Sequence, residues 1–158
     1  MPHRMGRWHG SAEAPMNVEA ILRNKGDSVA TVSPQASLAE AVAVLRREAI
    51  GALVVSRDGA KVEGILSERD VIHGLADHGT SLLGTRVEQL MTRRVHTCTP
   101  GDDVADLAAE MTKRRIRHIP VLRDGALAGI VSIGDVVKAR LDEMEYETSS
   151  LRSFIAGA

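Results

Sequence analysis

Hydrophobic and polar positions switch between helical and strand spacing along this chain. Apolar residues recur every three or four positions over 38–49, which predicts a helix with one buried face that Ser37 caps. Short apolar runs at 52–55 and 62–66 then predict two buried strands joined by a turn at Asp58-Gly59. With a strand before this helix and a helix after Ser67, the expected order is strand, helix, strand, strand, helix.

The second half shows the same order. Residues 104–111 repeat the helical spacing behind Asp102 or Asp103, and either aspartate can cap the helix. Strands are expected at 119–122 and 127–131, around the turn Asp124-Gly125.

The two halves also share short stretches of amino-acid sequence. VATVSP at 29–34 returns as VHTCTP at 95–100, and GILSERD at 64–70 returns as GIVSIGD at 129–135. Two copies at such a long spacing indicate two stacked supersecondary units rather than an extended array. We therefore expect a mixed α/β fold in which two β-α-β-β-α repeats pack sheet against sheet. Pseudo-twofold symmetry would create two equivalent clefts.

This repeat divides the chain into expected segments. They are a flexible leader at 1–16, a first repeat at 17–78, a linker at 79–86, a second repeat at 87–141 and a helical tail at 142–158. The last helix of each repeat should turn apolar side chains inward, namely Val71, Ile72 and Leu75, and then Val136, Val137 and Leu141. In the tail, Leu151, Phe154 and Ile155 predict a helix that docks on the domain or on a second subunit.

Composition narrows the function. The chain has 158 residues, a net charge of −1 and only 2% aromatic residues, which argues against nucleic acid as a partner. No apolar run reaches the roughly 18–20 residues of a membrane helix. A single cysteine, Cys98, suits a reducing, cytoplasmic setting and is expected in the core. The six histidines lack the spacing and partners of a metal site.

Both copies place a serine and an aspartate where a strand gives way to a helix. Ser67 precedes Asp70 by three residues, and Ser132 precedes Asp135 by the same interval. Free amide groups and the helix dipole at such a point attract anions, and a carboxylate there can accept both hydrogen bonds of a ribose diol. The alternative is a pair that only caps the helix, contributing roughly 0.5–2 kcal/mol. Occurrence at matched positions in both copies favours a binding function.

These motifs, together with Arg117-His118-Ile119-Pro120-Val121, resemble the cystathionine-β-synthase (CBS) domain over about residues 18–141. The resemblance implies a tandem pair that binds adenine nucleotides such as AMP, ATP, NAD(H) or S-adenosylmethionine and acts as an energy or redox sensor. It also implies homodimerisation through helical faces, assisted by the tail around Leu151 and Phe154. In that family the final Asp of the serine–aspartate motif typically holds the ribose.

Carried over by position, the resemblance implies residues for each cleft. For the first cleft they are Thr31, Ile50, Gly51, Ala52, Ser67, Arg69 and Asp70. For the second they are Thr97, Arg115, Ile116, Arg117, His118, Ser132 and Asp135. Because the second set is the more basic, we expect the second cleft to take the more phosphorylated ligand.

Other basic residues lie outside these two sets or beside them. The cluster at 113–117 fits a solvated helix end and a phosphate clamp equally well, and Arg93 and Arg94 are expected at the surface.

The favoured interpretation is a regulatory module that binds adenine nucleotides, without catalysis or a catalytic cofactor, and signals by a conformational shift. Two alternatives stay open. One is a structural or protein-interaction dimer with degenerate clefts. The other is a small nucleotide-processing enzyme, for which no nucleophile–base arrangement is visible in the sequence. The downstream protein partner is unknown.

Overall fold

The first repeat forms a three-stranded sheet with helices against it. In the computed structural model, which describes residues 16–157, its strands are β1 (Thr31–Val32), β2 (Ala52–Val55) and β3 (Gly64–Ser67). β1 runs parallel to β2, and β2 runs antiparallel to β3. The helices are α2 (Leu38–Glu48) and α3 (Glu68–His78). The leader expected at 1–16 lies outside the described residues, apart from Met16.

The second repeat has the same order with a reduced first strand. β4 (His118–Arg123) and β5 (Ala126–Ser132) form an antiparallel hairpin between α5 (Val104–Arg114) and α6 (Ile133–Ala156). Asp124 and Gly125 have φ of 52° and 80°, as a two-residue turn between twisted strands requires. In place of a first strand, Cys98 makes one parallel bridge to Val121. The two-repeat mixed α/β fold expected from the sequence is confirmed.

Side-chain caps set the helix starts. Ser37 and Glu40 form the expected capping box at α2. Of the two candidates at α5, Asp103 caps the helix by accepting from the amides of Ala105 and Asp106, while Asp102 accepts from the amide of Thr99.

Two short helices cross from one repeat to the other. α1 (Val18–Lys25) opens the first repeat, yet its Val18, Ile21 and Leu22 are buried in the core of the second. After the 3₁₀ turn η1 (Gly79–Gly84), α4 (Val87–Leu90) opens the second repeat but packs in the core of the first through Val87. Each core is therefore completed by the helix that opens the other repeat.

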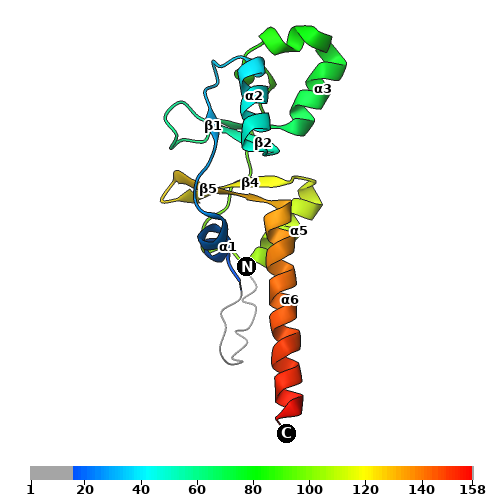
Figure 1. Ribbon diagram of the computed structural model, residues 1–158. Coiled ribbons are helices and arrows are strands. Elements are labelled where there is room, and N and C mark those ends of the chain that lie inside the picture. Colours follow the sequence, from blue (N-terminus) through cyan, green and yellow to red (C-terminus); the bar gives the residue numbers. More distant parts are fainter. Residues whose placement is uncertain (1–15, 158) are drawn as a thin grey trace, which may run out of the picture.

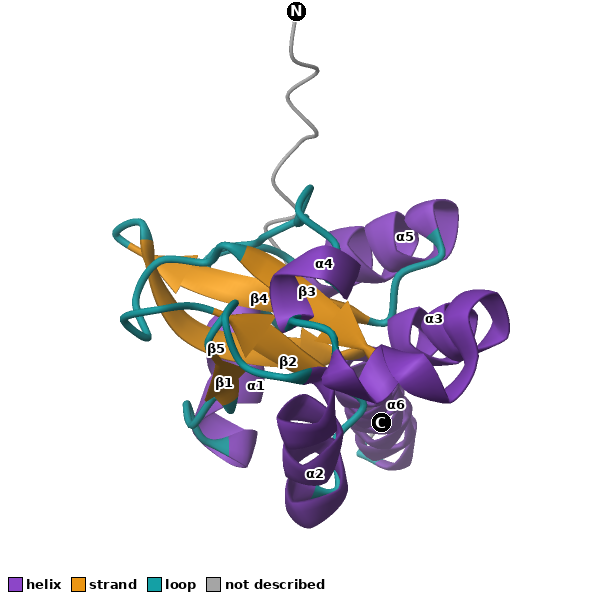
Figure 2. Ribbon diagram, turned by 90° about the horizontal axis from the view of Figure 1, so that it is seen from above, coloured by secondary structure: helices purple, strands orange, loops and turns teal. Residues whose placement is uncertain are grey.

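The two sheets lie face to face, with β1, β2 and β3 in one layer and β4 and β5 in the other (Figures 1 and 2). The two hairpins also touch, because the amide of Leu127 donates to the carbonyl of Ala60 at 2.8 Å. All four residues of β2 are buried, so this strand is the centre of the first sheet. The interface between the layers brings the ends of both hairpins together.

Some apolar residues expected inside are outside. Ile72 is 62% exposed, and Val137 and Leu141 are 51% and 54% exposed. Leu75 is also exposed, whereas Val71 and Val136 do contact the cores. Each helix is only half covered by its own sheet, so part of the apolar stripe faces solvent in this chain.

The tail forms no separate element. α6 runs without a break from Ile133 to Ala156, 24 residues, and projects beyond both sheets (Figure 1). Leu151, Phe154 and Ile155 are exposed, so docking on the domain of the same chain is not observed. Within residues 16–157, no helix is long and apolar enough to cross a bilayer.

Candidate functional site

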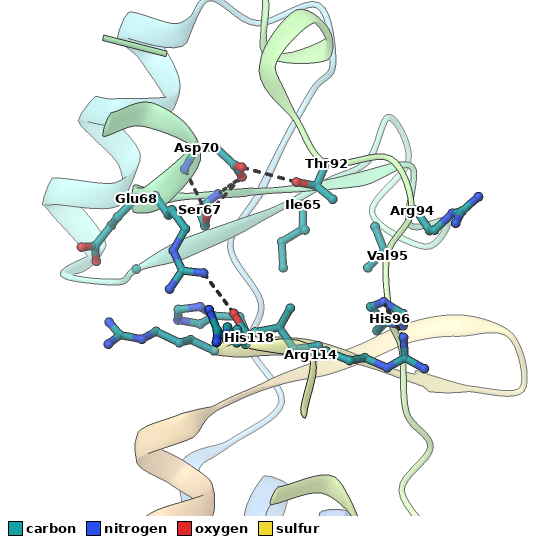
Figure 3. Close-up of a pocket in the computed structure, with 15 residues that line it drawn as sticks. Ile65, Ser67, Glu68, Asp70, Thr92, Arg94, Val95, His96, Arg114 and His118 are labelled. Carbon is teal, nitrogen blue, oxygen red and sulfur yellow. Dashed lines mark hydrogen bonds between the residues drawn. The ribbon is translucent and has the colours of Figure 1, made fainter. Parts of the chain in front are cut away.

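A cavity of about 350 Å³ opens between the two repeats, within the roughly 300–1,000 Å³ of small-molecule sites. Its wall comes from the β3–α3 junction, the segment after α4, and the turn from α5 into β4. The lining residues are Gly51, Ile65, Ser67, Glu68, Arg69, Asp70, Thr92, Arg94, Val95, His96, Arg114, Arg115, Ile116, Arg117 and His118. Figure 3 shows Ser67 and Asp70 on one side of this space and His96, Arg114 and His118 on the other.

Asp70 both caps α3 and borders the cavity. Its Oδ2 accepts from the Ser67 amide at 2.9 Å and from the Ser67 hydroxyl at 3.0 Å. The Asp70 amide donates back to Ser67 Oγ at 3.3 Å, which completes a capping box. Oδ1 has only a longer contact, 3.4 Å from Thr92 Oγ1. The capping interpretation is therefore correct for this pair, and one carboxylate oxygen is left with acceptor capacity toward a ligand.

The opposite wall is cationic. Arg94, Arg114, Arg115 and Arg117 line it, and Arg69 reaches across from α3 to donate to the Arg115 carbonyl at 3.0 Å. Arg114 is paired with Glu110 at 2.7 Å. Within residues 16–157 the other four arginines form no ion pair. Guanidinium groups without carboxylate partners beside a helix start form a site suited to an anion.

His118 sits where the repeats meet. Burial lowers the pKa of its imidazole, and the neighbouring charges of Lys25 and Arg117 act in the same direction, while those of Glu68 and Asp135 oppose them. A Cβ on Gly51 would lie 2.7 Å from Glu68 Oε1 and 3.1 Å from His118 Cε1. Gly51 thus permits the close approach of the repeats, and the lowered pKa favours the neutral form of His118.

The structure corrects the expected grouping of residues by repeat. The cavity combines Gly51, Ser67, Arg69 and Asp70 of the first repeat with the second-repeat segment 115–118. The basic residues assigned to the second cleft therefore line the same cavity as Asp70, although the charge of Asp135 also acts on His118. The reason is tertiary: β4 of the second layer begins opposite the start of α3 in the first.

Six sequence-predicted residues lie elsewhere. Ala52 is buried in β2, Ile50 packs against the first core, and Thr31 is exposed on β1. Thr97 lines a separate hollow beside Cys98 and Asp103. The remaining two are Ser132 and Asp135, which form the capping box of α6.

Asp135 is not equivalent to Asp70. Its Oδ2 accepts from Lys25 Nζ of α1 at 2.6 Å and from the Ser132 amide at 2.8 Å, and it borders a smaller hollow of about 90 Å³. Burial acts to raise the pKa of Asp135, but the hydrogen bond and charge of Lys25 and the Ser132 amide outweigh it, so the pKa is lowered. The ammonium group of Lys25 thus binds the carboxylate of Asp135, the residue that corresponds to Asp70 in the second repeat.

Several lining residues were missed from the sequence, namely Ile65, Glu68, Thr92, Arg94, Val95 and His96, whereas Arg114 belongs to the basic cluster for which a phosphate clamp was one of the two expected roles. Arg94 is exposed, as expected, and yet it borders the cavity. The segment 92–96 joins the site because Ile65 and Thr92 exchange backbone hydrogen bonds at 3.0 and 2.9 Å. The repeat offered a signal, since this segment runs into VHTCTP at 95–100, the second copy of the first motif.

The structure also bears on the cysteine and on metal binding. Cys98 is buried, and desolvation, aided by Asp102, raises the pKa of its thiol to about 12, which makes it an inert core residue. Residues 16–157 contain no group of three His, Cys, Asp or Glu side chains arranged to hold a metal ion.

Known proteins are similar to this chain in both sequence and fold. A family profile described as "CBS domain" matches residues 19–77 and 87–142. A mitochondrial CBS domain-containing protein of Arabidopsis thaliana is 34% identical over 148 residues, covering 89% of this chain and 72% of that protein. A CBS-domain-containing protein of Agrobacterium tumefaciens superimposes with a TM-score of 0.75 and 44% identity, covering 78% of this chain and 92% of the other.

A further solved structure contains ligands. The CBS domain pair of protein MJ0100, in complex with 5′-methylthioadenosine and S-adenosyl-L-methionine, has a TM-score of 0.72 and 26% identity. The alignment covers 82% of this chain and 99% of that one. Both halves of the present chain match the family profile, and their arrangement matches solved structures of CBS-domain proteins. This protein therefore belongs to the CBS domain family and is a tandem CBS pair.

Proposed function

We propose that the cavity between the repeats binds an adenine nucleotide that carries phosphate, and that the protein is a sensor rather than an enzyme. CBS pairs are regulatory modules for adenine ligands, and MJ0100 holds two such ligands. The observation that carries the proposal is the facing of Asp70 and the arginine wall across one cavity. A carboxylate suits the ribose hydroxyls, and arginines suit phosphate oxygens.

Charge favours some adenine ligands over others. Arg69, Arg94, Arg115 and Arg117 line the cavity without an ion-pair partner among the described residues, while Glu68 and Asp70 supply the carboxylates. This excess of positive charge attracts phosphates and opposes the sulfonium of S-adenosylmethionine. We expect ATP, ADP, AMP and NAD(H) to bind more tightly than S-adenosylmethionine or uncharged methylthioadenosine.

Binding would act on the contact between the repeats. Arg69 of α3 already bridges to the Arg115 carbonyl, so a phosphate that recruits either arginine competes with or reinforces this link. A ligand shifts a conformational equilibrium only if it binds the two states with different affinities. Both layers contribute to this cavity, so their relative position is the proposed output. Residence in the cytoplasm and homodimerisation remain predictions.

Isothermal titration calorimetry with AMP, ADP, ATP, NADH, S-adenosylmethionine and methylthioadenosine tests the proposal. Affinity should increase with phosphate charge and decrease with added salt. Arg117→Gln should weaken ATP binding about tenfold through the loss of a charge-assisted hydrogen bond. Arg46→Gln is the matched control, because Arg46 is exposed on α2 and remote from the cavity.

Three results would contradict the proposal in different ways. If none of the six ligands binds at millimolar concentration, the structural or protein-interaction alternative is favoured. If S-adenosylmethionine bound most tightly of the six, only the argument from charge would be refuted. Conversion of a bound nucleotide to a product, detected by chromatography, would favour the enzyme alternative.

A further inference from the structure

The chain has only three aromatic residues, Trp8, Tyr146 and Phe154, and all of them lie outside the matched family segments. Trp8 precedes the segment 19–77, and the other two follow the segment 87–142. Among the described residues, the two cores contain no aromatic ring. Aromatic side chains gain more than most from burial, so it matters what covers these three.

Tyr146 and Phe154 continue the side of α6 that is buried against the second repeat. That side is buried through Val136 and Ala139. Phe154 follows Val136 at a distance of about five helical turns, and Tyr146 follows Ala139 at about two, so both rings point the same way as the buried residues. This part of α6 extends beyond the sheets (Figure 1), where Tyr146 is 50% and Phe154 is 78% exposed.

We call this continuation the inner face of α6. It consists of Glu143, Tyr146, Glu147, Ser150 and Phe154. Their spacing of one, three or four residues places them in one stripe along the helix. The neighbouring Ile155 is 66% exposed but points about 100° away around the helix, so it lies outside the stripe.

The chain that leads into α1 meets α6 at the beginning of the inner face. The amide of Met16 donates to Glu143 Oε1 at 3.1 Å, across 127 positions of the sequence. The Met16 side chain also packs against the core of the second repeat. These two contacts hold residue 16 beside Glu143. Residues 1–15 are therefore attached to the rest of the protein at a point next to the inner face.

The distances allow Trp8 to reach both exposed rings. The stretch from Trp8 to Met16 can extend over about 26 Å, at up to roughly 3.3 Å per residue. Along α6, Phe154 lies about 16 Å beyond Glu143, at 1.5 Å per residue. Trp8 can therefore lie beside Tyr146 or Phe154 without full extension of the chain that carries it.

Charge complementarity favours the same contact. Residues 1–15 carry Arg4 and Arg7 against a single carboxylate, Glu13. The segment 141–151 of α6 has four carboxylates and no lysine or arginine, and two of the four, Glu143 and Glu147, lie on the inner face. Arg7 adjoins Trp8, just as Glu147 adjoins Tyr146, so docking of the rings brings opposite charges together.

We propose that residues 1–15 dock on the inner face of α6 in the same chain, with Trp8 against Tyr146 and Phe154. The occupant is the chain's own segment because the hydrogen bond from Met16 to Glu143 already places it there. The three rings then form a small cluster outside both cores, which holds the projecting half of α6. This contact does not involve the cavity between the repeats, so it stands or falls independently of nucleotide binding.

Fluorescence of the full chain tests the proposal, because Trp8 is its single tryptophan. Emission of the native protein should be blue-shifted relative to the urea-unfolded chain, and acrylamide should quench it less. Phe154→Gln should lower the ratio of docked to undocked Trp8 about two- to tenfold through the loss of an aromatic pair. Quenching should rise accordingly. Ile155→Gln is the matched control and should leave emission and quenching unchanged, because Ile155 points away from the inner face.

Four results would overturn the proposal. The first is native emission identical to that of the unfolded chain, which would mean that Trp8 is solvated. The second is blue-shifted emission that Phe154→Gln does not alter, which would place Trp8 on another surface. Equal responses to Phe154→Gln and Ile155→Gln would indicate a general loss of helix, which far-UV circular dichroism measures directly. Emission that changes with protein concentration would assign the inner face to residues 1–15 of a second copy.

Discussion

Lys25 Nζ lies 2.6 Å from Asp135 Oδ2, and it also donates to the Ile130 carbonyl at 2.9 Å. The matching carboxylate of the first repeat, Asp70, forms no ion pair within residues 16–157. The difference comes from helix length. α1 has eight residues and continues beyond its buried Leu22 for almost another turn, whereas α4 has four and ends before Thr92. The duplication has therefore produced one accessible carboxylate and one occupied by the chain's own lysine.

Replacing Lys25 should release the second carboxylate. We expect wild-type protein to bind one nucleotide per chain and Lys25→Gln to approach two, as measured by calorimetric stoichiometry. Stability should fall by at most about 1 kcal/mol, since the pair is partly solvated. Arg23→Gln, on the same helix but 77% exposed, is the control and should leave the stoichiometry unchanged. Two nucleotides bound by the wild type would show that Lys25 does not block Asp135.

The two aspartates offer a matched comparison between binding and capping. Asp70→Asn should weaken nucleotide binding roughly ten- to a hundredfold, because a charged acceptor for the ribose is lost. Asp135→Asn alters the same capping box in the second repeat but should leave affinity at the cavity unchanged. Each variant should lose about 1 kcal/mol of unfolding free energy in urea. Equal affinities for both variants and wild type would mean that Asp70 is only a cap.

The pKa of His118 should respond to nucleotide. Free protein should show the pKa below the ordinary 6.5, because burial disfavours the imidazolium. A bound phosphate favours the imidazolium and raises the pKa, so affinity should increase as pH falls below about 6.5. NMR titration of the ring protons, assigned with His118→Gln, measures both values. NAD is the suitable ligand, since its pyrophosphate does not titrate in this range.

The same shift has a consequence for stability. The folded pKa is depressed, so the unfolded chain takes up the proton first as pH falls. The contribution of neutral His118 to the free energy of unfolding is thus present above pH 6.5 and is lost as the pH falls below it. His118→Gln should abolish this pH dependence. A pKa at or above 6.5 in the free protein would contradict both expectations.

Close contact between α1 and the second sheet should be sensitive to one methyl group. A Cβ on Gly129 would lie 2.5 Å from Leu22 Cδ2, so Gly129→Ala should cost about 1–3 kcal/mol by overpacking. Leu22→Ala alone should cost about 2–5 kcal/mol, and the double variant should be more stable than the sum of the two losses implies. Gly101→Ala, with open space around it, is the control for urea unfolding. Strict additivity would mean that Leu22 and Gly129 do not touch in solution.

Sequence pattern predicted what depends on near neighbours in the chain. The duplication, the hairpin around Asp124-Gly125 and the capping serines are local, because turn geometry and helix caps involve residues two or three apart. The aspartate at each helix start was found in the same way. α1 was missed, since its apolar face has meaning only against the core of the other repeat.

Tertiary packing decided which of these local features meet. No periodicity could reveal that Arg117 faces Asp70, or that Lys25 reaches Asp135 across more than a hundred residues of chain. Nor could it show that Val137 faces solvent while Val136 is buried, because both lie on one broad apolar stripe. The sequence by itself determined two like units and their candidate chemistry. Long-range contacts between those units left Asp70 accessible at a cavity and paired Asp135 with Lys25. The reason is that each unit contributes residues to the core of the other and to the walls of its sites.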